Sequence, residues 1–384
     1  MTGNADVGYR SLGYSNQPQK EAKYITSNNA STSALFFKVT EDLGGGTKAN
    51  FMGEADFSLV KPSLANAAST NNGTQYTGGF FNGEQYLGLS GGLGDLKLGA
   101  PNSPALTAGT TAQPFGTGLG GGYSDTFGRM GTNAGTGISG YLGNATTSRI
   151  IRNERAAVYT TPTVAGFNGQ IEYAFQNGNG KAQASSANAD GTTWASNNNG
   201  YQAIAVNYNN GPVNAIAYSG KISAGAVAAS TAYAYGTGAA TSVLGATHDI
   251  TYKMLAGNYT AGATTVYAGY TTTVSSNQTA AAADVAEDSK SKNVAVKYVV
   301  GNIDLLANYL KRDSNRATDS GFTPNGNAKL VGLGANYNFS KNTLAYFRSE
   351  KQSNVATNGQ AADGSVTNAY GTVTITSVGL KTAF

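Results

Sequence analysis

Apolar and polar residues alternate along much of this chain with a period of two. In the segment GQIEYAFQN, Ile171, Tyr173 and Phe175 share one face, and the residues between them are polar or small. The final segment ITSVGLKTAF repeats the scheme and ends on Phe384. A period of two is typical of a β-strand with one apolar face, so both segments are predicted to be strands.

The same alternation recurs through the whole chain, whereas helical periodicity is absent over windows of comparable length. The sixteen predicted strands cover residues 3–12, 33–41, 46–60, 84–91, 93–100, 149–160, 168–177, 201–208, 212–221, 247–257, 263–272, 291–300, 302–311, 328–338, 341–351 and 370–384. The high content of Gly, Thr and Asn also disfavours helices.

The connections between these strands alternate in length. Short turns such as NNGP (209–212) and VGN (300–302) are followed by long polar segments. The long segments are 13–32, 61–83, 101–148, 178–200, 222–246, 273–290, 312–327 and 352–369. Short turns at one end and long loops at the other are typical of an up-and-down barrel inserted into a membrane from one side. We therefore predict an all-β, antiparallel, transmembrane β-barrel of 16 strands, in which the last strand pairs with the first.

Composition supports this class. The chain has 384 residues, 52 of them Gly, only 12% charged residues and a mean hydropathy of -0.27. No segment approaches the about 20 consecutive apolar residues of a membrane helix. There is no Cys, which excludes disulfides and thiolate metal sites, and the net charge of +4 comes without a dense Lys/Arg run, which gives nucleic-acid binding little support.

Several segments resemble the Gram-negative general porins, in particular the trimeric sixteen-stranded type of β-proteobacteria. They are TEDLGGGTKANFMGE (40–54), YLGLSGGLGDLKLG (86–99), RNERAAVYTTPTVAGFNGQIEYAF (152–175), GLGANYNFSKNTLAYF (332–347) and GLKTAF (379–384). The resemblance implies short periplasmic turns, long extracellular loops and a third loop, 101–148, that folds into the pore as a constriction. The whole of 1–384 would be one barrel, without enzymatic activity.

The resemblance also implies a location and partners. We expect a homotrimer in the outer membrane, exported with a signal peptide that is absent from this numbering, in contact with membrane lipid and lipopolysaccharide. In the family the terminal aromatic residue, here Phe384, belongs to the signal read by the barrel-assembly machinery. The expected function is passive diffusion of ions and small hydrophilic solutes.

Pore-lining residues follow from parity. If Phe37, Val39 and Leu380 face lipid, the alternate positions of the same strands face the lumen. Parity places Lys38, Lys48, Glu54, Lys97 and Lys381 on the lumen face. The resemblance adds Arg152, which matches a family arginine, and Asp125 and Arg129 in the third loop as further predicted pore-lining residues. Their excess of basic groups predicts weak anion selectivity. Anion-selective members carry arginines where this chain has Ala34, Gly83 and Ala100, which argues against a strong arginine ladder.

Other functions have less support. His248 is the single histidine and lies beside Asp249, but we interpret it as a residue at the mouth of a strand rather than a catalytic group. No cofactor is expected; the Asp- and Asn-rich loops leave Ca²⁺ binding open without specifying a site. A substrate-specific channel and a plugged barrel that acts as an adhesin remain alternatives, and a secreted β-helix hydrolase lacks the required fixed repeat.

Overall fold

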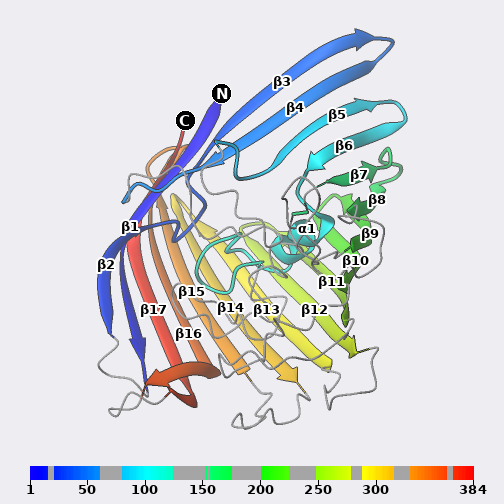
Figure 1. Ribbon diagram of the computed structural model, residues 1–384. Helices are drawn as coiled ribbons and strands as arrows, with labels where there is room; N and C mark the ends of the chain where they lie inside the picture. Colours follow the sequence, from blue (N-terminus) through cyan, green and yellow to red (C-terminus); the bar gives the residue numbers. More distant parts are fainter. Residues whose placement is uncertain are drawn as a thin grey trace, which may run out of the picture.

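A computed structural model describes residues 1–15, 21–60, 80–123, 152–153, 155–174, 200–224, 248–277, 288–314, 328–360 and 366–384. These residues form a single sheet of antiparallel strands that closes on itself, with one short helix (Figure 1). In this described part of the chain, no helix is long and apolar enough to cross a membrane.

The prediction of a sixteen-stranded barrel is confirmed, with one additional strand, β2. The first half of the sheet consists of β1 (Thr2–Tyr14), β2 (Ala22–Ser27), β3 (Ala34–Gly44), β4 (Thr47–Asp56), β5 (Gln85–Gly91), β6 (Gly94–Ala100), β7 (Ala156–Thr160), β8 (Phe167–Ala174) and β9 (Gly200–Asn210). The second half consists of β10 (Val213–Ala224), β11 (His248–Ala261), β12 (Thr264–Asn277), β13 (Asp288–Val300), β14 (Ile303–Ser314), β15 (Ala328–Asn338), β16 (Thr343–Gln360) and β17 (Val366–Ala383).

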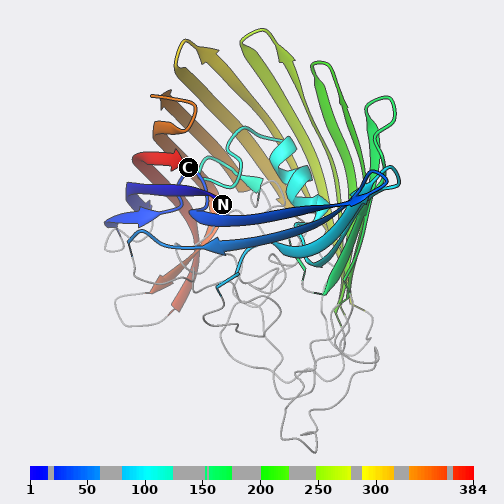
Figure 2. The same ribbon diagram turned by 90° about the horizontal axis from the view of Figure 1, so that it is seen from above.

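The first and last strands close the barrel. β1 pairs with β17 from Asn4↔Ala383 to Tyr14↔Val373. Beyond this ladder, the amide of Gly3 donates to the carbonyl of Phe384 at 2.7 Å and the amide of Phe384 donates back at 3.0 Å. The two termini therefore lie side by side in both views (Figures 1 and 2). The closed ladder removes the free edge that an open sheet would expose.

Tight turns join the strands at one end of the barrel. β9 and β10 are separated by Gly211 and Pro212, and β13 and β14 by Gly301 and Asn302. Gly211 and Gly301 both have a φ of 57°, a left-handed conformation that glycine adopts without steric cost. The short-turn end expected from the sequence is thus confirmed for these hairpins.

The two faces of the wall differ as the alternation predicts. Outward residues are apolar and exposed, for example Leu255 at 62% and Val294 at 60%. Their inward neighbours Met254 and Asn293 are buried, because the inner wall is covered by a segment of the chain. A surface with an apolar exterior and a partly polar interior is the arrangement of a transmembrane barrel.

Three local predictions were wrong. Residues 13–32 were expected to be entirely loop, but six of them form β2, which pairs with β1 from Val7↔Ser27 to Leu12↔Ala22. Of the described residues in the strand expected over 149–160, Ala156–Thr160 form β7, and Arg152 makes an isolated bridge with Asn102. The helix α1 (Pro104–Thr111) was not predicted, since its residues are nearly all small and give no contrast between two faces.

Candidate functional site: the channel interior

The inner wall of the barrel carries the segment 101–123, which follows β6. Figure 2 shows α1 and the chain after it inside the ring of strands. Ser103 caps the helix by accepting a hydrogen bond from the amide of Ala105, and Pro104 occupies the first turn. Both residues favour helix initiation at this position. The beginning of the third loop therefore lies within the barrel, as expected.

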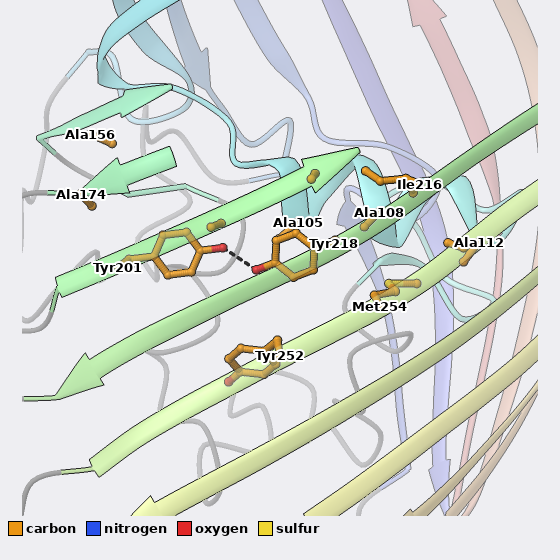
Figure 3. Close-up of a cluster of buried hydrophobic side chains, with 13 residues drawn as sticks. Ala105, Ala108, Ala112, Ala156, Ala174, Tyr201, Ile216, Tyr218, Tyr252 and Met254 are labelled. Carbon is orange, nitrogen blue, oxygen red and sulfur yellow. Dashed lines mark hydrogen bonds between the residues drawn. The ribbon is translucent and has the colours of Figure 1, made fainter. Parts of the chain in front are cut away.

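Small residues let α1 lie flat against the wall. Ala105, Ala108 and Ala112 are buried in a cluster with Ile216 of β10 and Met254 of β11 (Figure 3). Opposite the end of the helix, a β-carbon added at Gly269 of β12 would come within 2.9 Å of the β-carbon of Ala112. The helix is thus seated by apolar packing on one part of the wall.

A polar group of side chains holds the start of α1. The hydroxyl of Tyr201 lies 3.2 Å from that of Ser103. It also lies 2.5 Å from the hydroxyl of Tyr218 (Figure 3). Nearby, the buried carboxylate of Glu172 accepts a hydrogen bond of 2.7 Å from the amide side chain of Asn153. These inward tyrosines lie beneath the helix and are removed from the open channel.

Asparagine side chains of the wall hold the end of α1. Asn258 of β11 donates to the carbonyl of Thr111 at 3.1 Å, and Asn293 of β13 donates to the carbonyl of Ala112 at 2.6 Å. The last carbonyls of a helix lack partners within the helix itself. The wall satisfies them here and so fixes where the helix ends.

The glycine-rich stretch after the helix is attached to the adjacent part of the wall, strands β14 to β16. The carboxylate of Glu350 accepts hydrogen bonds from the amides of Gly120 at 2.7 Å and Gly121 at 3.1 Å. Asn308 donates to the carbonyls of the same two glycines at 3.3 and 3.0 Å. A β-carbon at Gly332 would overlap the carbonyl oxygen of Gly120, so β15 needs glycine there for the segment to lie this close.

A second inward segment, residues 28–33, completes the attachment. The carbonyl of Asn29 accepts a hydrogen bond of 2.8 Å from the amide of Leu119. This segment is itself held by Asp6 of β1, whose buried carboxylate accepts from the amides of Ala30 at 2.6 Å and Ser31 at 2.7 Å. Segment 101–123 is therefore fixed at both ends and spans much of the inner wall.

Two of the predicted pore-lining residues are brought together. Arg152 and Glu54 form an ion pair of 3.2 Å, with side chains only 15% and 11% exposed. Glu54 also accepts from the amide of Glu84 at 2.6 Å, and Arg152 donates to the side chain of Asn102 at 3.1 Å. The carboxylate of Glu54 thus offsets much of the positive charge that Arg152 would otherwise contribute to the open channel.

This pair lies where an arginine ladder would be expected. Ala34 and Ala100 are both buried, and a β-carbon at Gly83 would overlap the side chain of Glu54. Without rearrangement, a larger residue at position 83 would displace Glu54. The absence of arginines at these three positions therefore fits the local packing.

The predicted lysines face inward but lie at different positions along the barrel axis. Lys38 is exposed, with its ammonium 5.9 Å from the ring centre of Phe36. Lys97 lies 3.8 Å from the carboxylate of Asp95. Lys48 is opposite Asp42 beside the β3–β4 turn, at the mouth of the barrel. Lys381 is half-buried and pairs across the sheet with Asp6.

Other predicted residues are placed as follows. Asp125 and Arg129 lie outside the described residues, as does the rest of the predicted constriction loop, 124–148. Phe384 is 58% exposed on the outward side of the closing strand. His248 begins β11. Among the residues that the structure describes, no cluster of His, Cys, Asp and Glu could hold a metal ion.

Sequence reasoning missed the residues that anchor the loop, including Asp6, Asn308 and Glu350. The parity of β16 places Glu350 on the inward face, because its neighbours Phe347 and Val331 are exposed outside. Parity alone could have identified a lumen carboxylate. It could not have identified its partners, because the backbone amides of Gly120 and Gly121 are 230 and 229 residues away in the sequence.

Inward charges differ in their contact with solvent. The inward basic residues that retain some exposure are Arg10, Lys38, Lys48, Lys97, Arg152, Lys297, Arg312 and Lys381. The inward carboxylates divide into a buried set, Asp6, Glu54, Glu172 and Glu350, and a partly or fully exposed set, Asp42, Asp56, Glu84, Asp95 and Asp304. Basic groups therefore predominate among the water-accessible charges of the described interior.

Comparisons with known proteins agree with this architecture. The structure resembles the anion-selective porin from Comamonas acidovorans, with a TM-score of 0.71, 23% identity and coverage of 100% of this chain and 98% of that one. It also resembles OmpT of Vibrio cholerae, with a TM-score of 0.61, 15% identity and coverage of 100% and 96%. At these identities the likeness shows the fold.

Sequence comparison gives the family. Outer membrane porin protein 32 of Delftia acidovorans is 29% identical over 195 residues, which are 50% of this chain and 45% of that protein, so the match spans about half of this curated relative. The family model described as Gram-negative porin matches residues 1–357. The chain therefore belongs to the Gram-negative porin family.

Proposed function

We propose that this protein forms a water-filled channel for passive diffusion of ions and small hydrophilic solutes. Membership of the family places it in the outer membrane. The observation that carries the proposal is the segment 101–123, which lies along the inner wall of a closed barrel and is held there by wall side chains. A segment fixed in this way narrows the channel without closing it.

We further propose a weak preference for anions. Several inward carboxylates are buried; those of Asp6 and Glu350, for example, accept hydrogen bonds from backbone amides. Most inward basic groups, in contrast, keep contact with solvent. Water-accessible cationic groups raise the local concentration of anions. Since ion pairs such as Arg152–Glu54 and Lys97–Asp95 offset part of this field, the preference should be modest. The structurally similar Comamonas porin is anion-selective, which supports the same direction.

A homotrimer is part of the proposal. One Vibrio cholerae neighbour is described as a trimer form, at 14% identity. Contact with outer-membrane lipid, and recognition of Phe384 by the assembly machinery, likewise remain proposals from the family. The family and fold are those of channels and not of enzymes. A substrate-specific channel has less support, since Tyr201, Tyr218 and Tyr252 are buried and form no aromatic track along the open lumen.

Reversal potentials in a KCl gradient across a planar neutral bilayer test the proposal. We expect stepwise conductance and a modest anion preference at low salt that declines as salt rises, because the Debye length falls from about 10 Å at 0.1 M to about 3 Å at 1 M. Lys38→Gln should shift the reversal potential toward cations, whereas the matched variant Lys292→Gln, which removes an outward-facing lysine, should not. Absence of conductance would refute the channel, and cation preference in the wild type would refute the selectivity.

A further inference from the structure

The β3–β7 part of the inner wall supplies little uncompensated positive charge. Ala34, Gly83 and Ala100 occupy the three positions at which the resemblance predicts arginines. Arg152, the arginine that remains there, is paired with Glu54 at 3.2 Å. If the channel prefers anions as proposed, a cationic group on another part of the wall must supply the field.

Arg10 faces the interior from the closing seam, the pair of strands β1 and β17. It lies directly opposite Ser377, which is buried, and its inward neighbour along β1, Leu12, is also buried. Tyr9, between inward positions, is 43% exposed on the outer face. Arg10 itself is partly exposed, so its charge lies on the channel side of the wall and keeps contact with water.

No carboxylate offsets this charge at close range. Within the part of the chain that the structure describes, no carboxylate lies at ion-pair distance from Arg10. The inward carboxylate of the same strand, Asp6, is four residues or about 13 Å away along β1. It is also occupied by hydrogen bonds from the amides of Ala30 and Ser31. Arg10 therefore differs from Arg152, whose charge is paired.

A buried asparagine orients the guanidinium of Arg10. Its Nε donates to Oδ1 of Asn29 at 2.8 Å, and Asn29 is fully buried. The side-chain amide of Asn29 donates in turn to the hydroxyl of Tyr346 at 3.2 Å and to the carbonyl of Thr26 at 3.3 Å. Because the Tyr346 hydroxyl donates to Asp6 at 2.6 Å, it accepts from Asn29, and Oδ1 is left to face Arg10. Both terminal amino groups of Arg10 remain available.

Asn29 also contacts the segment that narrows the channel. Its carbonyl accepts a hydrogen bond of 2.8 Å from the amide of Leu119. A β-carbon at Gly118 would come within 2.7 Å of the carbonyl oxygen of Ala30, so segments 28–33 and 101–123 are tightly packed here. Arg10 therefore lies beside the point where segment 101–123 meets the closing seam. Electrostatic energy falls with distance, so a cation acts most strongly on ions whose path is restricted to its vicinity.

We propose, on the basis of the channel function and anion preference proposed above, that Arg10 is a selectivity-determining residue. Its guanidinium is held by a buried amide beside segment 101–123, and its two terminal amino groups can donate to a passing anion. A planar guanidinium fixed in this way loses little side-chain entropy when it binds an anion. Its charge also raises the local concentration of anions and lowers that of cations. The selective cation thus lies on the closing seam, and not on the β3–β7 part of the wall.

Reversal potentials of the full chain in KCl gradients across a neutral bilayer test this role. Arg10→Gln removes the charge and keeps an amide that can donate to Asn29. The matched control Lys23→Gln removes a lysine that lies directly opposite Ser11 on the outer face of the wall, one position from the residue opposite Arg10. We expect Arg10→Gln to lower the chloride-to-potassium permeability ratio about threefold at 0.1 M salt, the effect of a unit charge acting on both ions over about 7 Å in water. Lys23→Gln should behave as the wild type, and Arg152→Gln should have a smaller effect than Arg10→Gln.

Two further measurements distinguish charge from a structural role. Arg10→Lys keeps the charge and should retain most of the wild-type permeability ratio. Hydrogen exchange at the amides of Ala30 and Ser31, which Asp6 holds, should be unchanged in Arg10→Gln.

Four results would overturn the role of Arg10 while leaving the proposed channel intact. They are an unchanged ratio in Arg10→Gln, a larger effect of Arg152→Gln, equal losses in Arg10→Lys and Arg10→Gln, and faster exchange at Ala30 and Ser31 in Arg10→Gln. A wild-type channel without anion preference would refute the proposed selectivity, and the role of Arg10 with it.

Discussion

Glu350 is the wall residue whose loss should most directly release segment 101–123 from the wall. Its Oε2 atom accepts from the amides of both Gly120 and Gly121, while Oε1 accepts from the side chain of Gln352. Hydrogen bonds to charged groups contribute about 1.5–3 kcal/mol each, so Glu350→Ala should destabilise the attached state of the segment by about 3–6 kcal/mol. The barrel ladder does not depend on these bonds, so the variant should still fold.

Hydrogen exchange of the Gly120 and Gly121 amides measures this attachment. A loss of about 3 kcal/mol corresponds to exchange that is more than about 100-fold faster at both amides. Exchange in the β1–β17 ladder should be unchanged. In single-channel recordings the same variant should show frequent conductance fluctuations, since the segment is free to move within the channel.

A matched control separates anchoring from charge. Asp42→Asn removes an inward carboxylate that is exposed beside the β3–β4 turn and whose side chain accepts from the amide of Gly44. It should leave exchange at Gly120 and Gly121 unchanged. Unchanged exchange in Glu350→Ala, or an equal effect of Asp42→Asn, would refute the assignment of Glu350 as the anchor.

Other substitutions test independent contacts. Gly332→Val should push the segment away from β15 and alter conductance, because its side chain would occupy the position of the Gly120 carbonyl, whereas Gly13→Val, with no atom within 4 Å, should leave conductance as in the wild type. Arg152→Ala should weaken anion preference only slightly in KCl gradients, since its charge is already offset by Glu54; a large loss would show that Arg152 acts on the open channel. Phe384→Asp at the exposed end of β17 should cost roughly 0–1 kcal/mol in stability, so refolding yield in vitro should be near that of the wild type. A much larger loss of trimer in cells than in vitro would indicate recognition by the assembly machinery, and equal trimer levels would show that the residue is incidental.

The strands were predictable because membrane and channel impose opposite chemistry on alternate residues. Over residues 328–334 of β15 this contrast is strict: Leu330 is fully buried and its neighbours Val331 and Lys329 are exposed. Where the contrast vanishes, prediction failed. α1 is built largely from Ala, Thr and Gly, and its formation depends on the Ser103 cap and on packing against Ile216 and Met254, which are distant in the sequence.

The candidate site was predictable to a similar extent. Parity predicted the facing of the wall residues: Lys38 is directly opposite the buried Met52, and Lys97 is directly opposite the buried Val158. Their role in lining the pore stays a prediction. The pairing of Glu54 with Arg152 was not foreseen, because an ion pair across 98 residues depends on the barrel being closed. The same reason hides Asp6 and Glu350, whose partners in segments 28–33 and 101–123 are backbone amides that carry no sequence signal.

The attachment of segment 101–123 to the wall separates substitutions that change the charge of the channel from substitutions that change its width. The segment contributes mainly backbone groups, namely the carbonyls of Thr111 and Ala112 and the amides of Gly120 and Gly121, and the wall contributes the side chains that bind them. Side chains of the segment that point into the channel can therefore change in charge or size without loosening the attachment. Changes in the wall can shift the segment without altering its charges. Selectivity and aperture can accordingly diverge independently among related channels, through substitutions in different parts of the gene.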